Sequence, residues 1–263
     1  MSELIIPVRY YYLDAEGEEE RDETKFHFVH KVIKIDPKSS ALVLVDVWKS
    51  PEDVSEMKNA YDRVANIAKN KLAPAVEAAR KVGMCIIHAP SPPVAKKYPH
   101  LMWHAKDSEV APSPRTKGDW PPREFIRRVG EYSEYARLRR RPVPDDYDSK
   151  REIDDSVKPV PGDFVIATGE QLHGLLLDKK VLHLFYAGFA ANMCLQFRDY
   201  GMEAMSRRGY NLILLRDCTT AIESSETLRD LLTTKITVQQ IEILWGFSTI
   251  SEDFIKACNE LRP

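Results

Sequence analysis

The sequence lacks the features that mark several classes of protein. Its four cysteines form no C-x-x-C pair, so they indicate neither a zinc site nor a disulfide framework. No apolar run approaches the roughly 20 residues that a helix needs to cross a bilayer. The first 20 residues have no basic stretch followed by an apolar core, as a secretory signal would. We therefore expect a cytoplasmic protein that makes no contact with a membrane.

An excess of one charge is also missing. The 263 residues include 38 Lys and Arg against 40 Asp and Glu, which gives a net charge of −2. Such a balance provides no general attraction for nucleic acid or for an anionic membrane. With 43% hydrophobic and 30% charged residues, the composition is typical of a soluble globular protein. A small molecule is the expected partner.

Proline is sparse except in one part of the chain. Of 17 prolines, 12 lie between Pro90 and Pro161. The same part carries several aromatic residues, a basic run at 137–141 and an acidic run at 145–148. We interpret residues 91–160 as an insertion or lid, with a helical piece at 123–138. It would cover a site or join subunits, and a solvated charged face is the alternative.

The rest of the chain alternates between apolar β-branched runs and segments with helical spacing. This alternation predicts a doubly wound α/β fold, with a mostly parallel six-stranded sheet and helices on both faces. The expected strands are 41–48, 84–89, 163–168, 181–188, 210–217 and 242–247. The expected helices are 55–82, which Pro74 would kink, 170–178, 192–208, 227–242 and 251–261, with Ser251 as N-cap. We expect residues 1–263 to form a single domain, in which residues 1–40 are an N-terminal β extension of two strands around an acidic turn.

Ligands of such sheets bind at the carboxyl ends of the strands. One strand ends in a turn, AGFAANMC, that places Cys194 at the start of a helix, where the helix dipole would favour a thiolate. Backbone N–H groups of this turn would hold an oxyanion. Another strand, ALVLVDVW, ends in Asp46, which would take the thiol proton. A packed cysteine and a loop-capping aspartate are the alternatives. The turn is not G-x-G-x-x-G, so no cofactor is expected.

The segments ALVLVDVW, MCIIHA, AGFAANMCLQF and RRGYNLILLRDCTTA together resemble the isochorismatase-like cysteine hydrolases. The resemblance covers about residues 41–90 and 160–255. It implies a catalytic Asp, Lys and Cys, of which Asp46 and Cys194 match the first and last. It also implies a cis peptide bond before the cysteine, at Ala190–Ala191, and an oxyanion hole formed by Ala190, Ala191 and Cys194.

The family lysine has no counterpart, because Thr168 stands at its position. His88, His173 or a basic residue of the insertion are candidate replacements, since a cation near a thiolate lowers its pKa. Glu170 has the wrong sign for that role and would instead bind a cationic or amide group. The expected substrate-binding residues are Trp48, His88, Thr168, Glu170, His173 and Asn192. No metal is predicted, because no acid lies two residues before His88, as the resemblance would require.

The resemblance implies a cysteine-dependent hydrolase of a small amide, carbamoyl or ureido compound, assembled as a homodimer or homotetramer. Two alternatives remain open. One is a ligand-binding or partner-binding protein without ordinary turnover, since the lysine is missing. The other is hydrolysis of a vinyl ether. A thiol pKa well below the free value of roughly 8.5 would favour the enzyme, and a pKa near it would favour the binding protein.

Overall fold

A computed structural model describes residues 3–14, 22–49, 58–103, 120–137 and 150–261. Its centre is a sheet of eight strands in the order β2-β1-β8-β7-β6-β3-β4-β5. The bounds of the strands are β1 Leu4–Tyr12, β2 His27–Ile35, β3 Ser40–Val45, β4 Cys85–Ala89, β5 Phe164–Val165, β6 His183–Phe189, β7 Asn211–Thr220 and β8 Phe247–Thr249. No helix of the described residues is long and apolar enough to cross a membrane.

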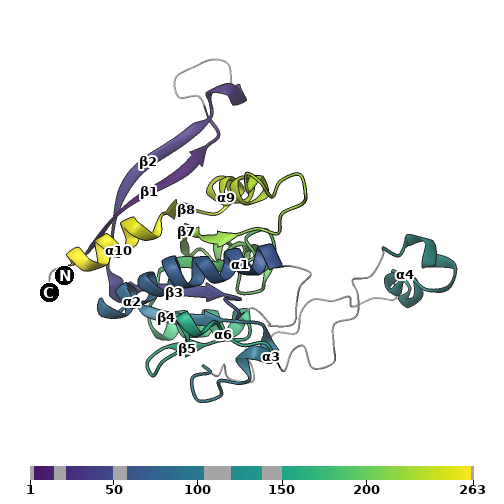
Figure 1. Cartoon of the computed structure of the whole chain (residues 1–263), viewed down its shortest axis with the longest axis horizontal. Coiled ribbons are helices and arrows are strands. Elements are labelled where there is room, and N and C mark those ends of the chain that lie inside the picture. The colour runs from purple at the N-terminus through teal and green to yellow at the C-terminus, as the bar shows by residue number, and fades with distance from the viewer. Residues whose placement is uncertain (1–2, 15–21, 50–57, 104–119, 138–149, 262–263) are drawn as a thin grey trace.

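Six of these strands, β3 to β8, run parallel to one another, as the alternation predicts. The other two, β1 and β2, form an antiparallel hairpin whose first strand pairs with β8. The hairpin rises from one edge of the sheet in Figure 1. The sheet therefore has two strands more than the six predicted, because the amino-terminal strands join it.

Helices cover both faces of the sheet. Their bounds are α1 Lys58–Ile67, α2 Ala73–Lys81, α3 Pro92–Ala95, α4 Arg123–Arg127, α6 Gly169–Asp178, α7 Cys194–Phe197, α8 Met202–Arg207, α9 Leu232–Leu244 and α10 Ser251–Glu260. One buried core joins α2 and α10 to one face, and a second joins α6, α8 and α9 to the other. Together with the parallel strands, these two layers make the fold doubly wound.

Several predicted elements differ from the observed ones. The predicted helix 55–82 begins at 55–57, outside the described residues; from Lys58 on it is two α-helices joined by a π-turn, Ala68–Leu72. The turn ends two residues before Pro74, which lacks the N–H that a regular turn would use. The predicted helix 227–242 is α9, which starts at Leu232 and runs to Leu244. The strand predicted at 242–247 is therefore shifted and is β8, Phe247–Thr249. Ile250, not Ser251, is the N-cap of α10.

The predicted helix 192–208 is broken. Helix α7 stops at Phe197 and α8 starts at Met202, because the chain turns tightly between them and Gly201 N–H donates to the Arg198 carbonyl at 2.8 Å. A Cβ on Gly201 would lie 2.5 Å from the Gln196 carbonyl oxygen, so only glycine fits the turn. The break gives Arg198 an extended backbone in place of a helical one.

The stretch between β4 and β5 is described only in part. It contains α3, α4 and a 3₁₀ turn, Gly130–Tyr135, so the predicted helical piece at 123–138 is two short turns. The acidic run at 145–148 and all but the first residue of the basic run at 137–141 lie outside the described residues. The acidic turn of the hairpin, at 15–21, lies outside them too.

Asp217, which lies on β7, holds the start of α10. Its carboxylate accepts hydrogen bonds from the Ser251 N–H at 2.8 Å and the Ser251 hydroxyl at 2.7 Å, and Lys71 pairs with it at 3.0 Å. Burial raises the pKa of Asp217, but the Ser251 bonds and the Lys71 charge outweigh it, so the pKa is lowered overall. This carboxylate therefore supports the fold.

We expect Asp217→Ala to lower the free energy of unfolding by about 1–2 kcal/mol at neutral pH, because it removes a helix-capping carboxylate and an ion pair. A folded-state pKa below the unfolded value means that the stabilisation is complete above the unfolded pKa. It is lost as the pH falls through the folded pKa. Urea unfolding at several pH values should therefore show the difference from wild type shrinking in acid. Asp62→Ala, which removes an exposed ion pair with Lys58, should change stability by less than about 0.5 kcal/mol. Equal losses for the two variants would contradict this role.

Candidate functional site

Asp46 follows β3 at the carboxyl edge of the sheet. Its backbone has a φ of 46°, and its N–H donates to the Ala89 carbonyl at 3.1 Å, which fixes it to the end of β4. Asp46 is only 1% exposed. One carboxylate oxygen, Oδ2, accepts from Arg198 at 3.3 Å, and the other, Oδ1, is buried with no hydrogen-bond partner among the described residues. A buried carboxylate with one oxygen unused is suited to accept a proton.

Gly188 brings the next strand close enough to form the site. It has a φ of 121°, and a Cβ there would lie 1.9 Å from the carbonyl oxygen of Val45, the residue before Asp46. Only glycine permits this approach of β6 to β3. The turn after Gly188 contains a cis peptide bond at Phe189–Ala190, one residue earlier than the predicted Ala190–Ala191.

Cys194 is the first residue of α7 and is partly exposed. Burial raises the pKa of its thiol to about 11, the negative charge of Asp46 adds to this, and Arg198 opposes it. The predicted lowering by a helix dipole is absent, because α7 has only four residues and so offers little dipole. The resting side chain is therefore a neutral thiol beside a carboxylate.

Arg198 is the cation that sequence reasoning missed. Its guanidinium pairs with Asp46 and opposes the rise in the pKa of Cys194. Its buried Nε has no hydrogen-bond partner among the described residues. Burial lowers the pKa of Arg198, but Tyr200, Asp46 and Cys194 outweigh it, so the pKa is raised and the group stays charged. Helical spacing could not have identified this contact, because α7 ends at Phe197 and Arg198 has an extended backbone.

Tyr200 fixes the segment that carries Arg198. Its hydroxyl donates to the Pro90 carbonyl at 3.1 Å, and its own carbonyl accepts from the Tyr186 hydroxyl at 2.9 Å. Tyr200 is 1% exposed, and burial raises the pKa of its phenol, as does the Asp46 charge. Asp46 and Arg198 are thus both anchored to the chain at 89–90.

The predicted oxyanion donors differ in availability. The Ala191 N–H already donates to the Thr220 carbonyl at 2.9 Å, whereas no hydrogen bond within the described residues uses the Cys194 N–H. Ala190 offers its carbonyl to the N–H groups of Met193 and Leu195, which closes the turn. The Cys194 N–H is therefore the better placed donor.

Two of the predicted substrate-binding residues lie beside this turn. Trp48 packs against Phe189, with ring centroids 6.5 Å apart, and edge-on against Tyr61. Asn192 exchanges two hydrogen bonds with Ile222, which ties the turn to the loop after β7. Its amide is thus engaged in holding the turn.

The other four predicted residues make contacts elsewhere. His88 is buried against Asp163, at 3.1 Å, and burial lowers its pKa. Thr168 caps α6 by accepting from the Gln171 N–H at 3.2 Å. Glu170 pairs with Arg208. His173 contacts the Tyr210 hydroxyl at 2.8 Å.

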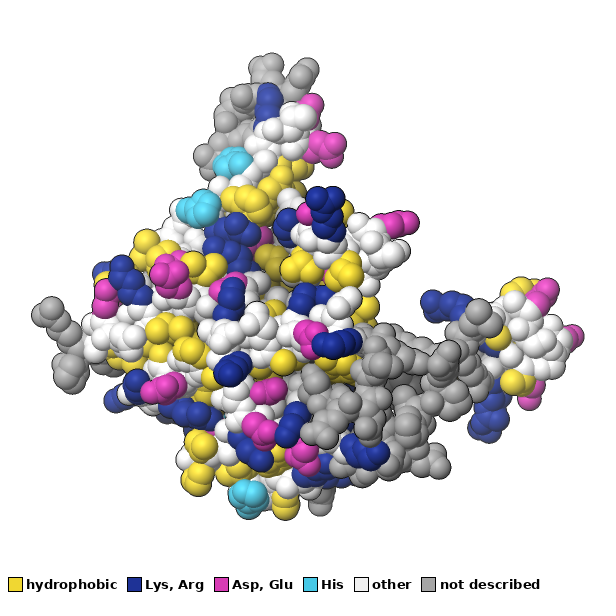
Figure 2. Space-filling view, viewed as in Figure 1, with side chains coloured by type: hydrophobic (Ala, Val, Ile, Leu, Met, Phe, Trp, Pro, Cys, Tyr) yellow, Lys and Arg dark blue, Asp and Glu magenta, His cyan; other side chains and the backbone are white. Residues whose placement is uncertain are grey.

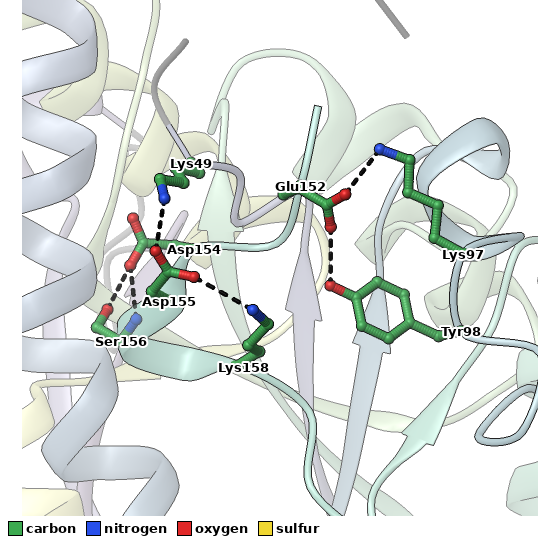
Figure 3. Close-up of polar contacts among 8 residues, drawn as sticks. All are labelled: Lys49, Lys97, Tyr98, Glu152, Asp154, Asp155, Ser156 and Lys158. Atoms are coloured by element: carbon green, nitrogen blue, oxygen red, sulfur yellow. Dashed lines mark hydrogen bonds and ion pairs between the residues drawn. The ribbon is translucent and has the colours of Figure 1, made fainter. Parts of the chain in front are cut away.

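The returning end of the 91–160 stretch lies against the loop after Asp46. Ile153 forms a bridge with Trp48, and the Lys49 N–H donates to the Glu152 carbonyl at 2.9 Å. Figure 3 shows Lys97 and Tyr98 converging on the Glu152 carboxylate, and Lys49 and Lys158 on Asp155. This network fixes the end of the stretch next to the site. Its lysines pair with Glu152 and Asp155 and do not contact Cys194.

Within the described part of the chain, no group of three or more His, Cys, Asp or Glu side chains is arranged to hold a metal ion. The polar groups of the site are instead a thiol, a carboxylate and a guanidinium, which together can pass a proton and balance a negative charge.

Comparison with known proteins matches no family model and no curated protein sequence. Solved structures do match. A cysteine hydrolase from Pseudomonas syringae pv. phaseolicola 1448A superposes with a TM-score of 0.54 at 17% identity, over 87% of this chain and 96% of that one. An isochorismatase family protein from Burkholderia thailandensis superposes with a TM-score of 0.51 at 14% identity, over 84% of this chain and 96% of that one. The chain therefore has the isochorismatase-like fold.

Proposed function

We propose that the protein is a cysteine-dependent hydrolase of a small amide, carbamoyl or ureido compound. The observation that carries the proposal is the convergence of Cys194, Asp46 and Arg198 at the carboxyl ends of β3 and β6. A partly exposed thiol beside a buried carboxylate and a guanidinium is the set of groups that nucleophilic acyl transfer requires. The fold shared with a cysteine hydrolase supports this assignment.

The raised pKa of Cys194 sets the order of events. Because the thiol is neutral at rest, its proton passes to Asp46 as the sulfur attacks the carbonyl carbon. The carbonyl oxygen becomes an oxyanion, to which the Cys194 N–H donates. Asp46 has then lost its charge, so the positive charge of Arg198 balances the oxyanion.

The second half of the reaction returns the proton. The C–N bond breaks, the leaving nitrogen takes the proton from Asp46, and the carbonyl carbon remains on sulfur as a thioester. Asp46 then removes a proton from a water molecule that attacks the thioester, which releases the acid and restores the thiol. The net reaction consumes one water and yields an acid and an amine or ammonia.

The raised pKa of Cys194 also favours a second function, that of a ligand-binding protein. A thiol held neutral without a lysine also suits a ligand-binding protein that does not turn over its ligand. The two functions differ in what the Asp46 carboxylate does: in the enzyme it accepts the thiol proton, and in the binding protein it only repels the thiolate.

Cys194→Ala should abolish hydrolysis in a screen of small amides and ureides, followed by release of ammonia or amine, because no other group can form the thioester. Cys85→Ala is the matched control. Cys85 is also partly buried, burial raises its pKa to about 12, and it lies at the opposite end of its strand from the site. Turnover that survives in Cys194→Ala would overturn the proposal.

Asp46→Asn should change two properties in opposite directions. Removal of the negative charge lowers the pKa of Cys194, so labelling by iodoacetamide at pH 8 should become faster. Hydrolysis should fall by about 10²–10⁴-fold, because the general base is gone. Asp62→Asn, an exposed carboxylate, should alter neither.

The measurements are the rate of label incorporation, followed by mass, and the steady-state rate of hydrolysis. Faster labelling with unchanged turnover would show that Asp46 is not the base. No turnover in wild type or in variant, with faster labelling in the variant, would favour the binding protein.

A further inference from the structure

Arg63 on α1 has hydrogen-bond partners but no counter-charge in the described structure. Its guanidinium donates to the Thr220 hydroxyl at 3.3 Å, to the Ala221 carbonyl at 3.4 Å and to the Asn59 carbonyl at 3.2 Å. All three acceptors are neutral and all three bonds are long. No carboxylate of the described residues forms an ion pair with Arg63. Its charge and some of its donors are therefore open to an anion.

These contacts place Arg63 at the same edge of the sheet as the nucleophile. Thr220 pairs with Phe189 across β7 and β6, and its carbonyl accepts the Ala191 N–H at 2.9 Å. Arg63 therefore reaches from α1 to the strand that supports the turn before Cys194. In Figure 1, α1 starts at the end of the sheet toward which β3 points. Thr220, the last residue of β7, thus contacts both the guanidinium of Arg63 and the turn before Cys194.

The charges of the site make this arginine distinctive. Asp46 and Arg198 cancel each other, and Cys194 is neutral at rest. Within the described residues, Arg63 forms no ion pair. The carboxylate that its hydrogen-bond network reaches through Thr220 and Thr234, Glu223, accepts instead from the Thr233 and Thr234 N–H groups. A guanidinium forms its strongest contacts with carboxylates, which match its paired donors.

We propose that Arg63 binds a carboxylate at the far end of the substrate whose carbonyl carbon Cys194 attacks. The substrate class is thus a small amide, carbamoyl or ureido compound that also carries a carboxylate. This inference rests on the proposed hydrolase function for its catalytic part, but the charge preference of the site exists with or without turnover.

Two alkylating agents of nearly equal size test the preference directly. Iodoacetate carries a carboxylate where iodoacetamide carries a neutral amide, and both modify Cys194. We expect Arg63→Met to lower the ratio of the iodoacetate rate to the iodoacetamide rate by at least about tenfold, the loss of one charged contact. Arg63→Lys should restore most of the ratio, because it keeps the charge.

The matched control is Arg207→Met, which removes an exposed arginine of α8 that pairs with Glu203. It should leave the ratio unchanged. If Arg63 only held β7 in place, Arg63→Met would slow both reagents equally and Arg63→Lys would not restore the difference. An unchanged ratio or an equal slowing would overturn the inference.

A turnover measurement separates this inference from the proposed function. Succinamate and succinamide differ only in a carboxylate in place of a second amide. We expect wild type to have a lower KM for succinamate, and Arg63→Met to raise that KM about tenfold with little change in kcat. Equal KM values for the two amides in wild type would overturn the carboxylate assignment while leaving Cys194-dependent hydrolysis intact. If Cys194-dependent hydrolysis is absent, the proposed function fails, and the alkylation ratio still decides whether Arg63 selects anions.

Discussion

The site depends on one ion pair, between the buried carboxylate of Asp46 and the guanidinium of Arg198. Removal of a carboxylate from water is costly unless a cation and hydrogen bonds replace the lost hydration. Here the cation comes from a segment that the Tyr200–Pro90 bond holds in place, and the carboxylate from a backbone fixed by Ala89. Without that pair, the thiol would face an uncompensated negative charge. The close approach of β6 to β3 at Gly188 makes the pair possible.

The same pair places a positive charge beside Cys194, although Thr168 stands where the resemblance would place a lysine. Thr168 is occupied as the N-cap of α6, so no cation comes from there. The positive charge comes instead from Arg198, which lies four residues after Cys194 in the chain. A guanidinium keeps its proton at any physiological pH, so Arg198 is a fixed positive charge.

The sequence allowed the parallel sheet, and the position of Asp46 and Cys194 after its strands, to be predicted, because buried strands read as continuous apolar runs and strand ends are visible in them. It did not reveal Arg198, because the helix through 192–208 was taken as unbroken. The break depends on the close contact of Gly201 with the Gln196 carbonyl and on the Tyr186 hydroxyl, which lies on a different element. His88 and Glu170 were misleading for a similar reason. Their partners, Asp163 and Arg208, are distant in sequence.

Cys194 and Arg198 lie within five consecutive residues of one short peptide, whose position is set by β6 and by Tyr200. The thiol and the guanidinium are therefore carried by one and the same piece of backbone. The long stretch between β4 and β5 can change in length and composition without altering the distance between them. A change in that stretch would therefore alter what packs against Trp48 and Lys49, while the thiol and the guanidinium keep their spacing.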